Sequence, residues 1–474
     1  MFDRLKSFFS PARARTVIRT VKARFDAAQT TADNARHWSA ADALSADADA
    51  SPEVRRILRM RSRYEVANNS YARGLVLMLA NDTVGTGPRL QMLGEDEGLN
   101  DRIEAAFARW SEAVRLPQKL RTMRMARCQD GETFAVMLYN PRLKGKVKLD
   151  LAVVEADRVR GENLLADRED ECDGISYDAW GNPVSYRILR RHPGDPTALS
   201  VNEEAVAVPA EHVIHVFRQD RPEQRRGVPE LAAALDLFAQ LRRYNKAVLS
   251  AAEAAADFAA VLYTDSPPDG EADSLDPMDT IQLERNMMLT MPAGWKLGQL
   301  DPKQPSSTHA EAVKCYLTEI ARCVCSTYGC VSGDYSGYNY ASGRLDNQIY
   351  RKGISVDRSK WEAEALNALF REWLREYSLL NPDLDLDPDE NGDHCWFWDG
   401  FGHADPVKEA TAQQMRLANN TTTLAAECAQ DGRDYLAVLR QRAKELRLMR
   451  EMEIPIAVNG NQVPEKDEEK KDDE

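Results

Sequence analysis

Residues 227–261 read GVPELAAALDLFAQLRRYNKAVLSAAEAAADFAAV. Pro229 fits the first turn of a helix, and the apolar residues from Leu231 to Ala252 keep near-helical spacing. The run Ala251–Ala256 is a strong helix former, and its small side chains permit close approach by a neighbouring element. This pattern predicts one helix over 229–261, roughly 50 Å long at the usual rise per residue. A globular domain rarely needs a helix of that length.

The chain after this helix predicts an insertion and a return helix. Residues 262–305 are rich in Pro, Asp and Gly, with a short strand expected at Met287–Met291. Thr308 and Glu311 have the spacing of a capping box. The next helix is expected over 306–328, so two long helices flank the insertion.

Upstream, helices give way to strands. We expect residues 1 to about 80 to be helical, with the apolar pattern clearest in Arg55–Ala80. A turn at Val84–Pro88 and a helix from Asn100 to Val114 are expected to follow. Between residues 133 and 217 the apolar period shortens, which predicts an α+β region. Its expected strands are Phe134–Tyr139, Val147–Val154, Val184–Leu189 and His212–Phe217.

Downstream, Gly- and Tyr-rich residues 329–343 predict a flexible loop. A long helix is expected from Arg344 to Tyr377, with Gly353 as its weak point. Two further helices are expected at Val407–Ala418 and Asp434–Met452. No internal repeat is visible.

Charge and composition limit the function classes. The net charge is −14, whereas a protein that grips DNA tightly usually has a basic surface. Residues 1–24 are basic and residues 465–474 are acidic, which predicts solvated ends. The longest apolar run is too short to span a membrane, and the first residues lack a signal-peptide core. We therefore expect a protein that is cytoplasmic when it is made.

Motifs for catalysis are missing. The sequence contains no G-x-x-x-x-G-K-[ST], no G-x-S-x-G and no H-E-x-x-H. The cluster Cys323, Cys325 and Cys330 lacks the spacing of zinc ligands, so buried thiols are expected. The stretch Asp387–Asp393 resembles part of a calcium loop, but Trp398 stands where a glutamate is needed.

A few other residues were weighed as sites. Asp130 with Glu132, and Asp399 with Asp405, could hold magnesium only if the fold brought them together. The dispersed histidines, His212 and His215 among them, are interpreted as ordinary strand residues. We expect no metal and no cofactor.

Nine stretches along the chain resemble the lambda-like family of phage portal proteins. The most specific is Arg221–Pro229, RPEQRRGVP. The others are Asn68–Gly74, Asn81–Gly87, Asp130–Glu132, Asp178–Val184, His192–Asp195, Val208–His215, Ser332–Asp334 with Asn339–Ser342, and Asp405–Ala410. The chain departs from the family at Cys330 and Val331, where a Val-Pro-like pair is expected.

The resemblance implies a ring of about twelve subunits, closed by heterologous interfaces, at one capsid vertex. It implies an α+β portal fold with a mixed wing, a helical stem hairpin, a small clip, a kinked tunnel helix and a helical crown. Carried over by position, these parts are a basic segment (1–24), the wing (25–228 with 378–406), the stem helices (229–261 and 306–328), the clip (262–305), the channel loop (329–343), the kinked helix (344–377), the crown (407–452) and an acidic tail (453–474).

The resemblance also implies partners. The ring would pass double-stranded DNA without sequence specificity, and the clip would dock the terminase motor and head-completion proteins. Capsid and scaffold proteins would surround it, and no reaction would be catalysed. The clip docking candidates are Pro267, Pro268, Asp269 and Gly270, and the DNA-facing candidates are Ser332, Gly333, Tyr335, Gly337, Tyr338, Asn339, Tyr340 and Gly343.

Alternatives remain open at this point. The tyrosines of the loop could line the channel, or could pack on the wing as an ordinary connection. For the whole chain, the competing functions are a non-enzymatic scaffold that forms another helical assembly and a metal-dependent nuclease.

Overall fold

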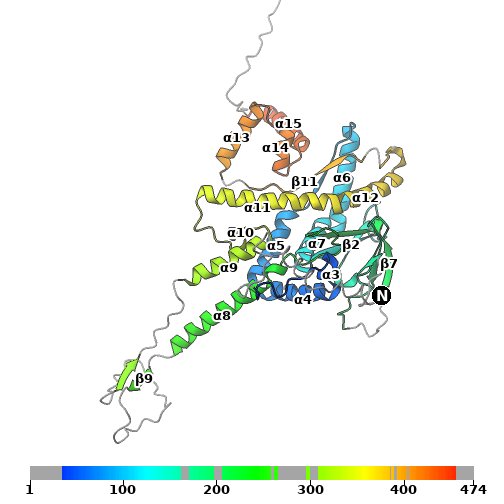
Figure 1. Cartoon of the computed structure of the whole chain (residues 1–474). Coiled ribbons are helices and arrows are strands. Elements are labelled where there is room, and N and C mark those ends of the chain that lie inside the picture. Colours follow the sequence, from blue (N-terminus) through cyan, green and yellow to red (C-terminus); the bar gives the residue numbers. More distant parts are fainter. Residues whose placement is uncertain are drawn as a thin grey trace, which may run out of the picture.

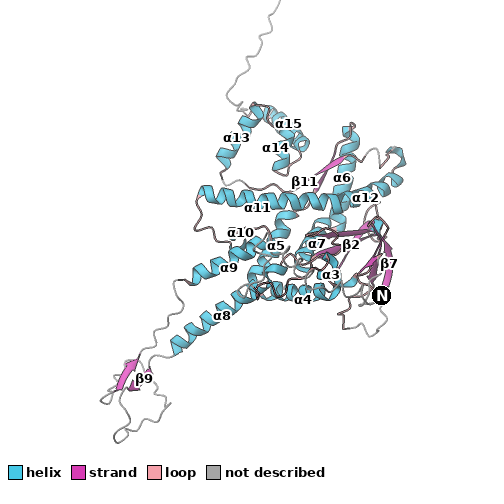
Figure 2. Ribbon diagram, in the orientation of Figure 1, coloured by secondary structure: helices cyan, strands magenta, loops and turns pink. Residues whose placement is uncertain are grey.

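The computed structural model describes residues 35–161, 170–196, 205–257, 261–264, 295–298, 308–384, 386–388, 392–402 and 405–454. Figure 1 shows a mixed body, two long helices that project from it, and a group of helices at the opposite end of the molecule. Coloured by secondary structure, the same view separates the largely helical frame from the strands gathered on one side of the body (Figure 2).

The N-terminal helices of the body are α3 (Ala46–Asp49), α4 (Pro52–Asn68) and α5 (Ser70–Thr83). The expected helical character is confirmed over α4 and α5, which are two helices because the backbone of Asn69 is extended. The side-chain oxygen of Asn69 accepts the N–H groups of Tyr71 and Ala72, so this residue ends one helix and caps the next.

Helix α6 (Glu97–Val114) confirms the helix predicted at Asn100–Val114, and Asp96 caps its start. Helix α7 (Leu116–Asp130) was not predicted. Arg115 separates the two with a left-handed backbone, and Pro117 lies in the first turn of α7.

All strand pairs are antiparallel within the described residues. One sheet has the order β3-β2-β8 and another the order β4-β5-β6-β7. Their strands are β2 (Glu132–Tyr139), β3 (Leu149–Val154), β4 (Glu171–Cys172), β5 (Ile175–Tyr177), β6 (Pro183–Leu189), β7 (Ala205–Pro209) and β8 (Val213–Phe217). The four expected strands are confirmed, with shifted ends.

A further pair joins distant parts of the chain. Strand β1 (Arg89–Met92) pairs with β11 (His394–Phe397), and neither was predicted. Beside this pair, Phe107 and Trp110 of α6 pack with Phe370 and Trp373 in an aromatic core.

The two long helices are α8 (Leu235–Asp257), entered through the short 3₁₀ turn η4 (Ala232–Ala234), and α9 (His309–Cys323). They lead away from the body to the strand pair β9 (Val261–Thr264) and β10 (Trp295–Gly298) (Figure 1). The predicted helix end at Val261 is wrong, because Val261 begins β9. Thr308 precedes α9 but makes no capping bond with its side chain. The strand expected at Met287–Met291 lies outside the described residues.

The loop and helix after α9 differ from expectation. A short helix, α10 (Tyr328–Ser332), occupies part of the predicted loop, and α11 (Tyr340–Trp361) begins earlier than Arg344. The helix is regular at Gly353. Its irregularity is instead the π-helical turn η5 (Glu362–Leu366), after which α12 (Asn367–Leu380) continues.

The C-terminal helices are α13 (Pro406–Ala418), α14 (Leu424–Gln430) and α15 (Tyr435–Glu451). The first and last confirm predictions, and α14 adds a helix in the expected polar stretch. Among the described residues, no helix combines the length and apolar character needed to cross a membrane.

Candidate functional site: the root of the long helices

The stretch Arg221–Pro229 leads from β8 to the start of the first long helix and lies against the turn between α7 and β2. Gly131 and Gly227 meet there, backbone to backbone. A Cβ atom on Gly227 would lie 2.2 Å from the carbonyl oxygen of Gly131. Gly131 has φ +93°, and its own Cβ would lie 2.3 Å from the carbonyl carbon of Val228. Only glycine fits at both positions.

A buried ion pair adjoins this contact. Arg226 donates to both oxygens of Glu132, Nε to Oε2 at 2.8 Å and Nη2 to Oε1 at 2.7 Å. The N–H of Gly227 donates to the same carboxylate at 3.1 Å. Burial alone would raise the pKa of Glu132, but Arg226 and a hydrogen bond with His215 hold that pKa well below its usual range.

Helix α4 joins the same network. Arg55 contacts Asp173 at 2.6 Å, and Arg59 contacts Glu132 at 3.2 Å. Arg226 also approaches Asp173, at 3.2 Å. The network therefore ties α4, both larger sheets and the entry to α8 together.

A second network centres on Glu230. Arg127 donates from Nε to Glu230 at 2.8 Å, and Arg124 contacts the other oxygen at 3.2 Å. Both arginines also reach Asp357 of α11. The Cys323 thiol at the end of α9 donates to the carbonyl oxygen of Glu230 at 3.2 Å.

The charges around Glu230 set its ionisation. Burial opposes the charged form, but Arg124 and Arg127 outweigh it and lower the pKa of Glu230 to about 2. The carboxylate of Glu230 thus links the root of α8 to α7 and, through the shared arginines, to α11, while the backbone carbonyl of the same residue links to the end of α9.

Carboxylates weighed as magnesium ligands have other partners. Asp130 pairs with Arg63 at 2.7 Å, and Glu132 pairs with Arg226. Asp399 accepts the N–H and hydroxyl of Thr86, both at 2.6 Å, and Asp405 caps α13. The structure does not bring these acids together. His215 lies in β8 as expected, whereas His212 ends a short 3₁₀ turn before it.

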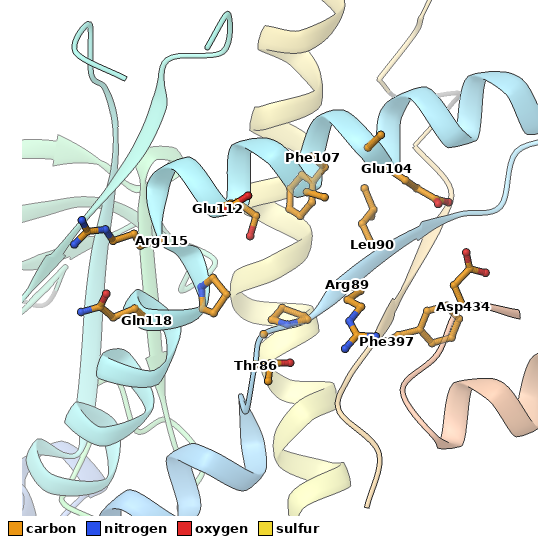
Figure 3. Close-up of a pocket in the computed structure, with 16 residues that line it drawn as sticks. Thr86, Arg89, Leu90, Glu104, Phe107, Glu112, Arg115, Gln118, Phe397 and Asp434 are labelled. Atoms are coloured by element: carbon orange, nitrogen blue, oxygen red, sulfur yellow. The ribbon is translucent and has the colours of Figure 1, made fainter. Parts of the chain in front are cut away.

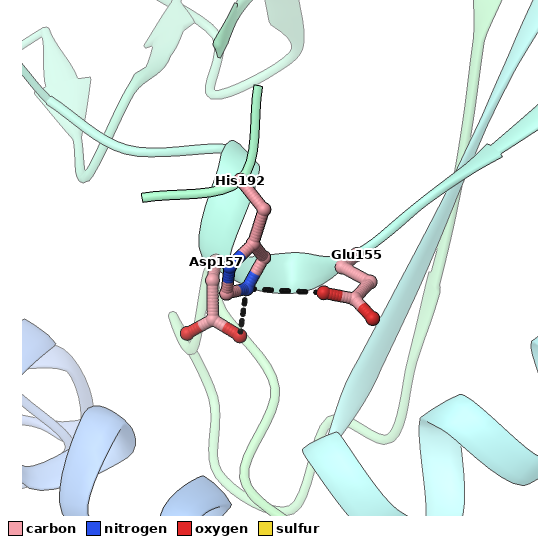
Figure 4. Close-up of side chains that lie close together, drawn as sticks. All are labelled: Glu155, Asp157 and His192. Atoms are coloured by element: carbon pink, nitrogen blue, oxygen red, sulfur yellow. Dashed lines mark ion pairs between the residues drawn. The ribbon is translucent and has the colours of Figure 1, made fainter. Parts of the chain in front are cut away.

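Glu155, Asp157 and His192 do lie together (Figure 4). The imidazole Nε2 of His192 is 3.0 Å from Glu155 and 3.6 Å from Asp157. Arg63 contacts Asp157 at 2.6 Å, and Arg59 approaches it at 3.5 Å. Two guanidinium groups on the same carboxylate compete with any cation, so the arrangement is an ion-pair network.

The cysteines are all free thiols. The prediction of buried thiols in the cluster is wrong for Cys325, which is exposed, while Cys323 and Cys330 are partly buried. Within Asp387–Asp393, the stretch that resembles part of a calcium loop, Asp389 and Asn391 lie outside the described residues.

A hollow of about 640 Å³ lies between α6, β1 and the start of α7 (Figure 3). Phe107, Leu90 and Phe397 line its apolar part, and Glu104 and Arg89 lie at its polar side. Glu104 accepts the N–H of Met92 at 2.8 Å, which fixes its carboxylate in place.

The candidate channel-loop residues form a tied turn between α10 and α11. Ser332 ends α10, and Gly333 follows with φ +69°. The ring of Tyr335 lies on Gly329 and 5.4 Å from the ring of Tyr338, whose hydroxyl accepts the N–H of Gly329 at 3.1 Å. Both tyrosines therefore pack on α10.

The rest of the turn starts the next helix. Asn339 and Ser342 form a reciprocal capping box, and the ring of exposed Tyr340 lies 4.7 Å from the Lys408 ammonium. Gly337 and Gly343 have open space where a Cβ would be. The clip candidates Pro267, Pro268, Asp269 and Gly270 lie outside the described residues.

These ion-pair networks hold the roots of both projecting helices to the body of the protein. The model of the lambda family of phage portal proteins matches residues 31–358. Because this match spans more than two thirds of the chain, the chain belongs to that family. Its function is that of a phage portal protein, which forms the channel at the capsid vertex.

Individual proteins and solved structures are also similar to this chain. A probable portal protein of Halomonas phage phiHAP-1 is 25% identical over 452 residues, covering 88% of this chain and 86% of that protein. The neck of an empty gene transfer agent particle contains a chain with 15% identity and a TM-score of 0.48, covering 84% of this chain and 97% of that one. The neck of the native particle, with C12 symmetry, gives 15% identity and a TM-score of 0.45, covering 81% and 94%.

Proposed function

We propose that about twelve copies of this chain form a closed ring with heterologous interfaces, through which double-stranded DNA enters and later leaves the capsid. The observation that carries this proposal is the family match, which runs from the N-terminal helices through both long helices to α11. The acidic charge of the chain supports passage, because few counterions would be released from DNA in the channel.

Each part of the chain has a proposed role. The body from residue 25 to 228 with 378–406 is the wing, α8 and α9 are the stem, and the residues between them are the clip. In this assignment the clip docks the terminase motor and the head-completion proteins. The C-terminal helices are the crown, at the end of the molecule opposite β9 (Figure 1).

The loop between α10 and α11 is proposed to face DNA. Its exposed side chains carry one acid, Asp334, and no base, so contact would be weak and independent of sequence. The packing of Tyr335 and Tyr338 on α10 supports a tied loop of fixed shape over an unrestrained one.

The chain is also proposed to have no catalytic activity, with ATP hydrolysis left to the motor. Native mass spectrometry of the purified protein tests the ring. We expect one dominant closed oligomer of about twelve chains. Monomers or dimers alone at micromolar concentration, in every salt condition tried, would contradict the proposal.

A further inference from the structure

One face of α11 is apolar and bare. Leu345, Ile349 and Val356 are 61%, 55% and 66% exposed. Their spacing of four and seven residues puts them on a single stripe of the helix. The opposite side of α11 is the buried one, and it carries Tyr350, Ile354 and Trp361.

The orientation of this stripe is fixed by the rest of the chain. The hydroxyl of Tyr350 donates to Asp82 at 2.6 Å, and Arg358 donates to the carbonyl oxygen of Thr83 at 3.0 Å. Asp357 joins the network of Arg124 at the root of the long helices. The helix therefore cannot rotate to hide its apolar stripe.

The charge of the same face is unusual for this chain. Across α11 the exposed charged residues are Arg344 and Lys352, both basic, in a protein with a net charge of −14. Lys352 lies beside the apolar stripe, whereas Arg344 lies on another side of the helix. Two copies of an acidic protein repel each other over most of their surfaces. A face whose exposed charged side chain is a cation, with no exposed acid, is one that another copy can approach favourably.

We propose that a second copy of this chain packs against the exposed face of α11, formed by Leu345, Ile349 and Val356 with Lys352. The inference rests on the proposed ring and names one of its two subunit faces. The contact is heterologous, so the neighbour covers the stripe with a different part of its surface. DNA is the less suitable occupant, because phosphates take polar and charged partners and the stripe offers aliphatic ones.

The test is the triple variant Leu345→Ser, Ile349→Ser, Val356→Ser, with native mass spectrometry and thermal melting. The side chains are already in water in the single chain, so the melting temperature of the monomer should change little. We expect at least a tenfold loss of rings at the same protein concentration. The control is Leu93→Ser, Val184→Ser, Leu379→Ser, which removes aliphatic groups that are 59%, 53% and 81% exposed on the body and should keep its rings.

The outcomes separate this inference from the proposed function. Rings from the wild type and from the triple variant alike would overturn the inference and leave the ring intact. A wild type that never forms rings would overturn both.

A direct readout does not depend on folding of the triple variant. A photoreactive benzophenone amino acid at position 349 of otherwise wild-type protein should give an adduct of two chains when rings are irradiated. Rings that yield no chain–chain adduct, or an adduct with added DNA in its place, would overturn the inference.

Discussion

Arg226 and Glu132 form a bidentate ion pair although neither residue exposes any surface to solvent. The pair joins the turn before the first long helix to the start of β2, at the point where Gly131 and Gly227 touch. If either partner of such a buried pair is removed, the folded protein is destabilised, because the remaining charge has lost its hydration and gains no ion pair in return.

Replacement of Arg226 by Ala is therefore expected to lower the free energy of unfolding by about 3–5 kcal/mol, since Glu132 stays buried without its main partner. Denaturant unfolding of the monomer measures this. The exposed Arg56→Ala, which breaks an ion pair with Glu53 on the surface of α4, should lower the free energy of unfolding far less, because both groups stay hydrated in the folded protein. Equal costs for the two variants would contradict the role given to the buried pair.

Acid should weaken the second network. The pKa of Glu230 is depressed in the folded protein to about 2 from an ordinary 4.5. A depressed pKa contributes stability that is complete above the unfolded value and is lost as the pH falls through the folded one. We expect the free energy of unfolding of the wild type to fall between about pH 4.5 and pH 2. The Glu230→Gln variant should be less stable than the wild type at neutral pH, and its free energy of unfolding should fall less over the same pH range.

The matched control for this experiment is Glu112→Gln, at an exposed position of α6. It should follow the wild-type pH profile. A Glu230→Gln protein with the same acid dependence as the wild type would show that Glu230 does not carry the effect.

The tyrosine turn between α10 and α11 can be removed without touching the capping box of α11. Deletion of Tyr335–Tyr338 should leave rings intact but reduce the DNA that filled heads package or retain, because the proposed contact with DNA is lost. Tyr139→Ser, at an exposed tyrosine on the body, is the control. Normal filling and retention with the deletion would favour the loop as an ordinary connection.

The proposed clip gives a second prediction about DNA packaging. Deletion of Pro267–Ser274 should block DNA packaging while rings still form, because these residues lie between the proposed stem helices in sequence. Packaging in an extract supplied with the motor, and ring formation, are measured on the same sample. Loss of the rings would mean that the segment is a core element.

Local patterns predicted much of this fold. The apolar spacing of α6 and α8 and the alternation in β2 and β6 are properties of neighbouring residues, so the sequence alone indicates them. The same patterns predicted the two helices, α8 and α9, on either side of the Pro-rich insertion.

Pairing between distant residues could not be predicted in this way. Val261 looks like the end of an alanine-rich helix, but it pairs with Gly298 and so belongs to a strand. Strand β1 exists because Leu90 pairs with Trp396, far away in sequence. Gly353 does not break α11, because the hydrogen bonds of the flanking turns offset the modest cost of one glycine.

The buried ion pairs could not be predicted from the sequence either, because their partners are also far apart along the chain. Asp130-Gly131-Glu132 was weighed as a pair of magnesium ligands, and only the fold shows that Arg63 and Arg226 reach these acids. The sequence feature that could have indicated the pair is the adjacent arginines Arg225 and Arg226, since a buried arginine needs an acidic partner.

The central claim is that this chain is the subunit of a ring with a channel for DNA, and electron microscopy of the purified wild-type protein tests it most directly. The account predicts closed rings of one subunit number, viewed end-on with a central hole wide enough for a DNA duplex. Single particles without a hole, or open filaments in place of rings, would contradict it.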